Sequence, residues 1–300
     1  MSAKVDLSVN FAGLSLKNPV MTASGTFSAK ASGEYYDISR LGAVITKGVA
    51  AEPWMGNPTP RIAETYGGML NAVGLQNPGA KAYIEEELPF LAKYDVPVIA
   101  NLAGHSVEEY CAVTELLNET DVKMFELNIS CPNVKEGGIG FGTDPRMAAA
   151  VTEAVKKVAK KPLMVKLTPN VTDITAIARA VEDAGADAVS LINTLLGMRI
   201  DLRTKKPLLA NGTGGFSGPA VKPVAIRMVY QVRRAVKVPI LGLGGIMTGE
   251  DAAEFLMAGA DAVAVGTAAL VNPTAPVDVV EGLRAFMEQN GYENIAALKA

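Results

Sequence analysis

The sequence contains few of the residue types that build metal sites and disulfide frameworks. It has one histidine, His105, and two cysteines, Cys111 and Cys131. Two cysteines cannot form a disulfide framework or a four-thiolate cluster, and no group of histidine, cysteine and carboxylate residues has ligand spacing. We therefore expect no metal bound by this chain and a location in a reducing cytoplasm. We expect His105 to cap or pack near a helix start, and Cys111 to be a small core residue.

Strong charge and long apolar runs are also absent from the sequence. The net charge is −3 and no long basic run occurs, which argues against nucleic acid as a partner. No apolar run is long enough to span a bilayer, and residues 1–6 lack the layout of a signal peptide. With 300 residues, of which 49% are apolar, the chain can bury the core of one large α/β barrel.

Eight short apolar segments alternate with helical patterns along the chain. Each is almost continuously apolar, as in strands of a parallel sheet. The expected strands are 20–23, 43–46, 96–100, 124–129, 163–167, 188–192, 239–243 and 262–265. The expected helices include 107–117, 145–159, 173–184 and 220–236, with Ser106, Asp144 and Thr172 as N-caps.

A partial internal repeat supports a barrel. The sequence Ala-Gly-Ala-Asp-Ala-Val occurs at 184–189 and again at 258–263, each time between a helix and a strand. Eight such units predict a TIM (β/α)8 barrel, which we expect to be a single domain spanning 1–300. We also expect an N-terminal hairpin from 5–9 and 12–16. The segments 50–79 and 195–219 are expected to be long inserted loops at the C-terminal face.

The segment Asn-Ile-Ser-Cys-Pro-Asn at 128–133 is the most informative motif. It follows an apolar strand and precedes a glycine-rich segment, 137–142, that we expect to close over a site. Because strand C-termini share one face of a barrel, this motif should meet Lys47 and Lys166, which end two other apolar strands. The glycine motifs after the last two strands, Gly244-Gly245 and Gly266-Thr267, indicate a phosphate-bearing ligand, but the glycine spacing is not that of a Rossmann nucleotide site.

Taken together, the motifs resemble those of class 1 dihydroorotate dehydrogenases, nearly from end to end. They are 128–133, Asn-Ala-Val-Gly-Leu-Gln-Asn at 71–77, Thr46-Lys47-Gly48, Gly244-Gly245 and Gly266-Thr267. The resemblance implies a TIM barrel that carries one FMN and oxidises (S)-dihydroorotate to orotate in pyrimidine biosynthesis. Segment 215–223 resembles the NAD-dependent class 1B. In that class a homodimer of catalytic chains lies within a heterotetramer, together with electron-transfer subunits carrying FAD and a [2Fe–2S] cluster.

The resemblance also implies roles for individual residues. Cys131 would be the base that removes the C5 proton while hydride passes to FMN. The residues implied for FMN binding are Ser24, Lys47, Gly48, Asn101, Asn128, Lys166, Ile192, Gly218, Gly244, Gly245, Gly266 and Thr267. Those implied for substrate binding are Lys47, Asn71, Ala72, Val73, Gly74, Leu75, Asn128, Asn133, Asn193 and Thr194.

Three alternatives remain open at this level. A fumarate-dependent class 1A enzyme is less well matched by 215–223. A Schiff-base barrel aldolase or synthase would use Lys166 as nucleophile, but it leaves Asn128 and Cys131 without a role. A non-catalytic barrel that binds a phosphorylated ligand is disfavoured by a cysteine placed between asparagines.

Overall fold

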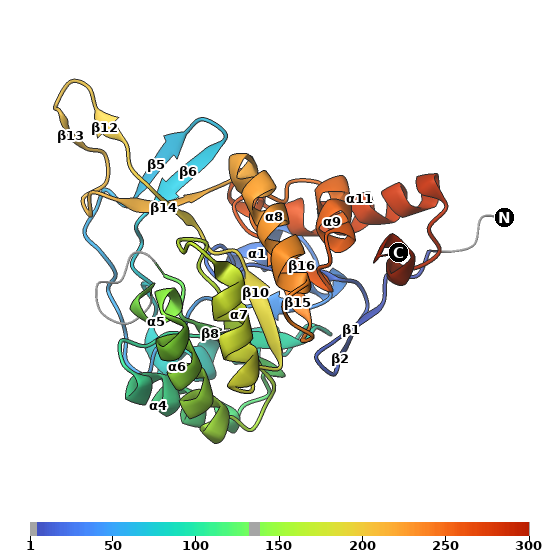
Figure 1. Cartoon of the computed structure of the whole chain (residues 1–300), viewed down its shortest axis with the longest axis horizontal. Coiled ribbons are helices and arrows are strands. Elements are labelled where there is room, and N and C mark those ends of the chain that lie inside the picture. Colours follow the sequence, from blue (N-terminus) through green and yellow to red (C-terminus); the bar gives the residue numbers. More distant parts are fainter. Residues whose placement is uncertain (1–4, 132–138, 300) are drawn as a thin grey trace.

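A computed structural model describes residues 5–131 and 139–299, and its centre is a closed parallel β-barrel (Figure 1). The strand order is β3-β16-β15-β10-β9-β8-β7-β4, and a parallel bridge between Met21 and Ala43 joins the first strand to the last. The barrel strands are β3 (Val20–Thr22), β4 (Val44–Ile45), β7 (Val98–Leu102), β8 (Met124–Asn128), β9 (Leu163–Lys166), β10 (Ala188–Leu191), β15 (Ile240–Leu243) and β16 (Ala262–Val265). All eight predicted strands, and the TIM barrel they imply, are confirmed.

Helices surround the barrel and cover its outer face (Figure 1). The longer ones are α4 (Val107–Asn118), α6 (Pro145–Val158), α7 (Ile174–Asp183), α8 (Lys222–Arg233), α9 (Gly249–Met257) and α11 (Ala275–Asn290). Shorter helical pieces are α1 (Ala29–Tyr35), η1 (Ile38–Arg40), α2 (Gly79–Ala82), η2 (Tyr83–Glu87), α3 (Leu88–Leu91), α5 (Ile139–Thr143), η3 (Pro219–Val221), α10 (Ala268–Val271) and η4 (Ile295–Lys299). Among the described residues, no helix combines the length and apolar character needed to cross a bilayer.

The four predicted helices are present, and their caps follow simple chemistry. The Ser106 and Asp144 side chains accept hydrogen bonds from backbone N–H groups in the first turns of α4 and α6, as predicted. The predicted cap at Thr172 is wrong by one residue. Asp173 caps α7 instead, because its carboxylate accepts from both the backbone N–H and the hydroxyl of Thr175.

The N-terminal hairpin closes one end of the barrel. It consists of β1 (Val9–Phe11) and β2 (Leu14–Leu16), so its first strand begins four residues later than the predicted 5–9 segment. Phe11 and Leu16 are buried in the same cluster as Met124 and Met164, which lie near the N-terminal ends of their strands. The hairpin therefore acts as an apolar plug at the N-terminal end and leaves the opposite end for a ligand.

The two inserted segments form sheets, where the sequence predicted loops. A four-stranded antiparallel sheet has the order β11-β14-β6-β5, and β12 (Ile200–Asp201) pairs with β13 (Lys206–Pro207). The four strands are β5 (Ile62–Thr65), β6 (Gly68–Asn71), β11 (Leu195–Gly197) and β14 (Gly214–Ser217), and they extend together from the barrel (Figure 1). A Cβ at Gly68 would lie 1.9 Å from the Ser217 carbonyl oxygen. Some of these glycines therefore permit close strand contact rather than loop flexibility.

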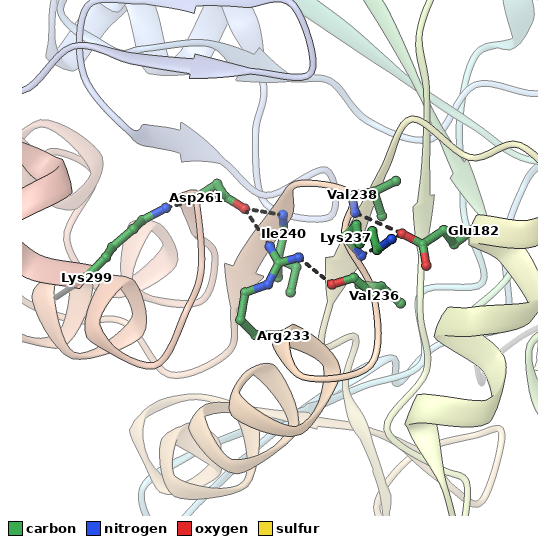
Figure 2. Close-up of polar contacts among 8 residues, drawn as sticks. All are labelled: Glu182, Arg233, Val236, Lys237, Val238, Ile240, Asp261 and Lys299. Carbon is green, nitrogen blue, oxygen red and sulfur yellow. Dashed lines mark hydrogen bonds and ion pairs between the residues drawn. The ribbon is translucent and has the colours of Figure 1, made fainter.

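The second copy of the sequence repeat forms a clamp at the N-terminal end of the barrel. The Asp261 carboxylate accepts a hydrogen bond from the backbone N–H of Ile240 at 2.8 Å and pairs with Arg233 at 3.3 Å and Lys299 at 2.5 Å (Figure 2). One side chain thereby joins the start of β15, the end of α8 and the last helical turn of the chain.

The first copy repeats this geometry two βα units earlier in the chain. The Asp187 carboxylate accepts from the backbone N–H of Leu163 at 2.7 Å and from the Lys156 ammonium at 2.5 Å. In both copies an aspartate placed just before one strand holds the first residue of the neighbouring strand. The repeated sequence thus encodes strand register at this end of the barrel.

Candidate active site

A cavity of about 1320 Å³, including the part open to solvent, lies at the C-terminal ends of the barrel strands. The inserted sheet forms one of its walls through β5, β6 and β14. The predicted site residues that line the cavity are Ser24, Lys47, Asn71, Val73, Gly74, Leu75, Asn128, Cys131, Lys166, Ile192, Asn193, Thr194, Gly218, Gly244, Gly245, Gly266 and Thr267. Residues from distant parts of the sequence therefore meet at one face.

The remaining predicted residues lie elsewhere. Asn101 and Ala72 are buried and do not line the cavity, and Gly48 packs so closely that an added Cβ would lie 3.0 Å from the Asn101 side-chain oxygen. Asn133 lies outside the described residues, as do 137–138 of the glycine-rich segment. The rest of that segment lies in α5, which begins at Ile139.

Two lysines, Lys166 buried and Lys47 half-buried, lie at the cavity floor. The Lys166 side chain ends β9, is only 5% exposed, and donates a hydrogen bond to the Ser24 hydroxyl at 3.2 Å. Burial lowers the pKa of Lys47, repulsion from Lys166 and Arg61 lowers it further, and attraction to a Cys131 thiolate opposes these effects. Within the described parts of the chain, neither lysine takes part in an ion pair with a carboxylate. The floor is therefore suited to an anionic ligand.

Cys131 is buried at the cavity wall just beyond β8, and the neighbouring backbone is firmly held. The Tyr110 hydroxyl donates to the Asn128 carbonyl oxygen at 2.6 Å, and burial raises the pKa of Tyr110, so the phenol stays protonated. The Asn193 amide donates to the Ser130 carbonyl oxygen at 2.8 Å and to its hydroxyl at 3.0 Å. These bonds hold the backbone that precedes Cys131, and Asn128, Cys131 and Asn193 line the same cavity.

Glycines line part of the cavity after β15 and β16. Gly244 and Gly245 have φ values of 118° and 88°, so the turn itself requires glycine there. Gly266 is different, because among the described residues an added Cβ would meet only Ala23 Cβ, at an ordinary 3.4 Å. Packing against the described part of the chain therefore does not require glycine at 266. The Thr267 hydroxyl donates to the Ser217 hydroxyl at 2.7 Å and links this region to the inserted sheet.

The apolar part of the cavity wall was not predicted from the sequence. It is formed mainly by side chains of the inserted sheet and of the loops after β15 and β16. The residues are Ile62, Met69, Phe216, Val221, Leu243, Ile246, Met247, Ala268 and Leu270. The sequence of 62–71 offered little signal for these strands, because its apolar and polar residues do not alternate as in a half-buried strand.

His105 and Cys111 lie outside the cavity lining. The His105 ring stacks on Trp54 with centroids 4.0 Å apart, which agrees with the predicted packing role near the start of α4. Cys111 is only partly buried, where a core position was predicted, and it contacts the outer core from α4. Among the described residues, no group of three or more histidine, cysteine or carboxylate side chains is arranged to hold a metal ion.

Comparisons with known proteins agree with this geometry. The family model described as dihydroorotate dehydrogenase matches residues 6–287. The chain is 63% identical over 297 residues to "Dihydroorotate dehydrogenase B (NAD(+)), catalytic subunit" of Alkaliphilus metalliredigens, covering 99% of this chain and 98% of that protein. It is 57% identical to the protein of the same name from Geobacillus kaustophilus, covering 97% and 93%.

Among solved structures, dihydroorotate dehydrogenase from Eimeria tenella in complex with ferulenol matches the fold with a TM-score of 0.80. The two are 22% identical, and the match covers 97% of this chain and 86% of the other. At this identity the likeness shows the barrel fold alone.

Proposed function

Because this chain belongs to the dihydroorotate dehydrogenase family, we propose that it is the FMN-binding catalytic chain that oxidises (S)-dihydroorotate to orotate in pyrimidine biosynthesis. The single observation that carries the proposal is the shared cavity. It joins a buried thiol, one buried and one half-buried lysine, and asparagine amides at the mouth of the barrel. We propose that residues 1–300 act as one FMN-binding domain.

The cavity residues fit FMN. The Lys166 ammonium is buried and its recorded partner is the neutral Ser24 hydroxyl, so an anionic ligand edge would compensate the cost of its burial. The open backbone at Gly266 and the turn at 244–245 would suit a phosphate group. When bound, FMN supplies hydride acceptance. Gly48 and Asn101 do not line the cavity and would support FMN binding indirectly. Asn101 would do so through its hydrogen bond with Asn128, and Gly48 by letting the backbone pack closely against Asn101.

The chain's own residues supply the proton chemistry. We assign Cys131 as the base that removes the C5 proton, a contribution of roughly 10²–10⁴-fold. Asn71, Asn128 and Asn193 offer amide groups that match the amide edges of a pyrimidine ring, and Asn133 is proposed with them from the sequence. The Lys47 ammonium would balance the substrate carboxylate. Because Cys131 is buried, bulk water competes little for its proton.

Electrons must then leave the chain. The relatives are named as catalytic subunits of an NAD(+) enzyme. We propose that this chain likewise transfers electrons to NAD through a separate cytoplasmic subunit carrying FAD and a [2Fe–2S] cluster, with a homodimer of this chain inside a heterotetramer. The two cysteines, Cys111 and Cys131, are too few for a cluster site of its own.

One anaerobic experiment tests the proposal and its alternatives. The purified chain should be yellow, contain about one FMN, and lose its flavin absorbance when mixed with dihydroorotate. A colourless protein inactivated by borohydride in the presence of a carbonyl substrate would favour a Schiff base at Lys166. A flavin-free protein unaffected by either treatment would favour a barrel that only binds a phosphorylated ligand.

A further inference from the structure

A carboxylate lies inside the barrel directly below the cavity. Glu126 is in the middle of β8 and has 0% exposure. Side chains two residues apart on a strand point the same way, so Glu126 shares its face with Met124 and Asn128. Met124 belongs to the apolar interior cluster and Asn128 lines the cavity. Glu126 therefore lies between the apolar interior and the cavity floor.

Two neutral side chains donate to this carboxylate. The Asn101 amide nitrogen on β7 lies 2.5 Å from one Glu126 oxygen, and the Ser190 hydroxyl on β10 lies 2.7 Å from the other. Burying a carboxylate is costly even when it is hydrogen-bonded, and apolar side chains of similar volume often give equal or greater stability. Contribution to folding stability therefore does not explain why an acid occupies this position.

The hydrogen bonds continue from Glu126 to the cavity wall. The Asn101 side-chain oxygen accepts from the Asn128 amide nitrogen at 3.2 Å. The Asn128 side-chain oxygen accepts from the Ser130 backbone N–H at 3.3 Å and from its hydroxyl at 3.1 Å. The series ends one residue before Cys131.

The groups at the two ends of this series fix which side-chain atoms donate and which accept along it. The Asn101 NH2 group donates to the Glu126 oxygen, so the Asn101 oxygen is turned towards Asn128. A backbone N–H can only donate, so Asn128 must turn its oxygen towards Ser130 and its NH2 group towards Asn101. One N–H of the Asn128 amide is left to donate into the cavity. The Asn128 oxygen already accepts from Ser130 and is not available to a ligand.

We propose that Glu126 is a positioning residue that fixes the amide polarity of Asn101 and Asn128, so that Asn128 presents a hydrogen-bond donor to the ligand ring. The group that faces Asn128 is then an acceptor, such as a ring carbonyl oxygen. The inference rests on the proposed function, because the ring in question is the pyrimidine of dihydroorotate or orotate. It assigns a role to a residue that touches neither substrate nor cofactor.

The test compares three variants of the FMN-loaded protein. Glu126→Met removes both acceptor oxygens but keeps a side chain of similar length. Glu126→Gln retains one acceptor for Asn101 and turns its NH2 group towards the Ser190 hydroxyl. Asp261→Asn is the control, since it weakens a carboxylate clamp at the opposite end of the barrel. Orotate affinity is measured from the change in flavin absorbance, alongside the melting temperature.

We expect Glu126→Met to weaken orotate binding by about tenfold or more, because Asn101 loses its acceptor and no longer holds Asn128. Glu126→Gln should stay within about threefold of the wild type, and Asp261→Asn should lower the melting temperature without changing orotate affinity. If Glu126→Met does not fold, the near-isosteric double variant Glu126→Gln with Ser190→Ala replaces it. Because the NH2 group of the introduced glutamine then lacks the Ser190 hydroxyl as a partner, this double variant should bind orotate less tightly than Glu126→Gln alone.

Two results would overturn the inference. One is a folded Glu126→Met protein that binds orotate as tightly as the wild type. The other is a loss of melting temperature in Glu126→Met with no selective loss of affinity, as in the Asp261→Asn control. Failure of the wild-type protein to bind orotate or react with dihydroorotate would instead contradict the proposed function, so the two failures are distinguishable.

Discussion

At the scale of single residues, the site concentrates positive charge where water is largely excluded. Lys166 is buried and Lys47 mostly so, and the Arg61 charge acts on Lys47 as well. A buried ammonium is costly unless an anion or a strong dipole faces it. The presence of Lys166 and Lys47 at the cavity floor indicates that folding stability is lowered in exchange for ligand binding, a trade common at functional sites.

The first prediction tests this trade at Lys47. Burial lowers its pKa from the ordinary 10.5, so the charged form is destabilised in the folded protein. That cost is present below the lowered pKa and disappears as the pH rises towards 10.5. We expect Lys47→Met to raise the melting temperature at pH 7, to raise it less near pH 10, and to weaken orotate binding at least about tenfold. An equal gain at both pH values would show that charge burial is not the cause.

The second prediction concerns Cys131. We expect Cys131→Ser to retain FMN but to slow flavin reduction by dihydroorotate at pH 7 by roughly 100-fold or more, because a hydroxyl is a far weaker acid than a thiol. Part of the rate should return as the pH rises. Anaerobic stopped-flow absorbance measures the rate, with flavin content as the control. A rate near that of the wild type would remove Cys131 from the base role.

At the scale of elements, the loop after β15 is held by the cap of the next helix. The Asp251 carboxylate accepts from the backbone N–H groups of Met247 and Thr248 at 2.9 and 3.0 Å. Its other oxygen pairs with the Lys222 ammonium of α8 at 2.7 Å. A single side chain thus fixes the two residues that follow the Gly244–Ile246 turn and ties them to a neighbouring helix.

The third prediction is that Asp251→Asn loosens this loop. Burial raises the pKa of Asp251, but the bonds from Lys222, Met247 and Thr248 outweigh burial and hold it below the ordinary 3.8. Its contribution is therefore complete above pH 3.8 and is lost as the pH falls through the lowered value. We expect Asp251→Asn to lower the melting temperature and FMN retention at pH 7, and the difference in melting temperature to shrink as the pH falls below 3.8.

Glu254→Gln is the matched control for that prediction. Glu254 also contacts Lys222, at 2.8 Å, but half of its side chain is exposed, and the loop N–H groups of Met247 and Thr248 donate to Asp251 instead. Exposed ion pairs contribute little to stability. Equal effects of the two substitutions would mean that the ion pair with Lys222, rather than the hydrogen bonds to the loop, determines the melting temperature and FMN retention.

Secondary structure was predicted correctly where one local feature of the sequence was sufficient. The barrel strands are buried on both faces, so they are apolar throughout and stand out in the sequence. The inserted sheet was read as loops because Gly68 and Gly215 resemble turn residues, whereas their backbones lie against Ser217 and Thr194. The Glu126–Asn101–Asn128 series depends on the register between β7 and β8, which spacing along the chain does not reveal.

At the scale of the whole molecule, exposed apolar side chains gather on the inserted segments and α10. Leu202 is 89% exposed, and Tyr66 of the β5–β6 turn is fully exposed. Further large apolar side chains are exposed in the same regions: Ile62, Leu196, Met198, Ile200, Leu270 and Val271. Exposed apolar side chains of this kind mark interaction surfaces, and Ile62 and Leu270 among them also line the cavity. This agrees with the proposed assembly.

The fourth prediction therefore concerns the assembly. Alone, the chain should react with dihydroorotate at its own flavin yet reduce NAD poorly, because its sequence has neither a dinucleotide fingerprint nor enough cysteines for a cluster. Adding the FAD and iron–sulfur subunit should restore NAD-linked turnover, and the two should co-purify. Steady-state assays with NAD and with fumarate, each with and without the partner, measure the outcome. Efficient NAD reduction by the isolated chain would contradict the need for a partner, and rapid turnover with fumarate would assign the chain to class 1A.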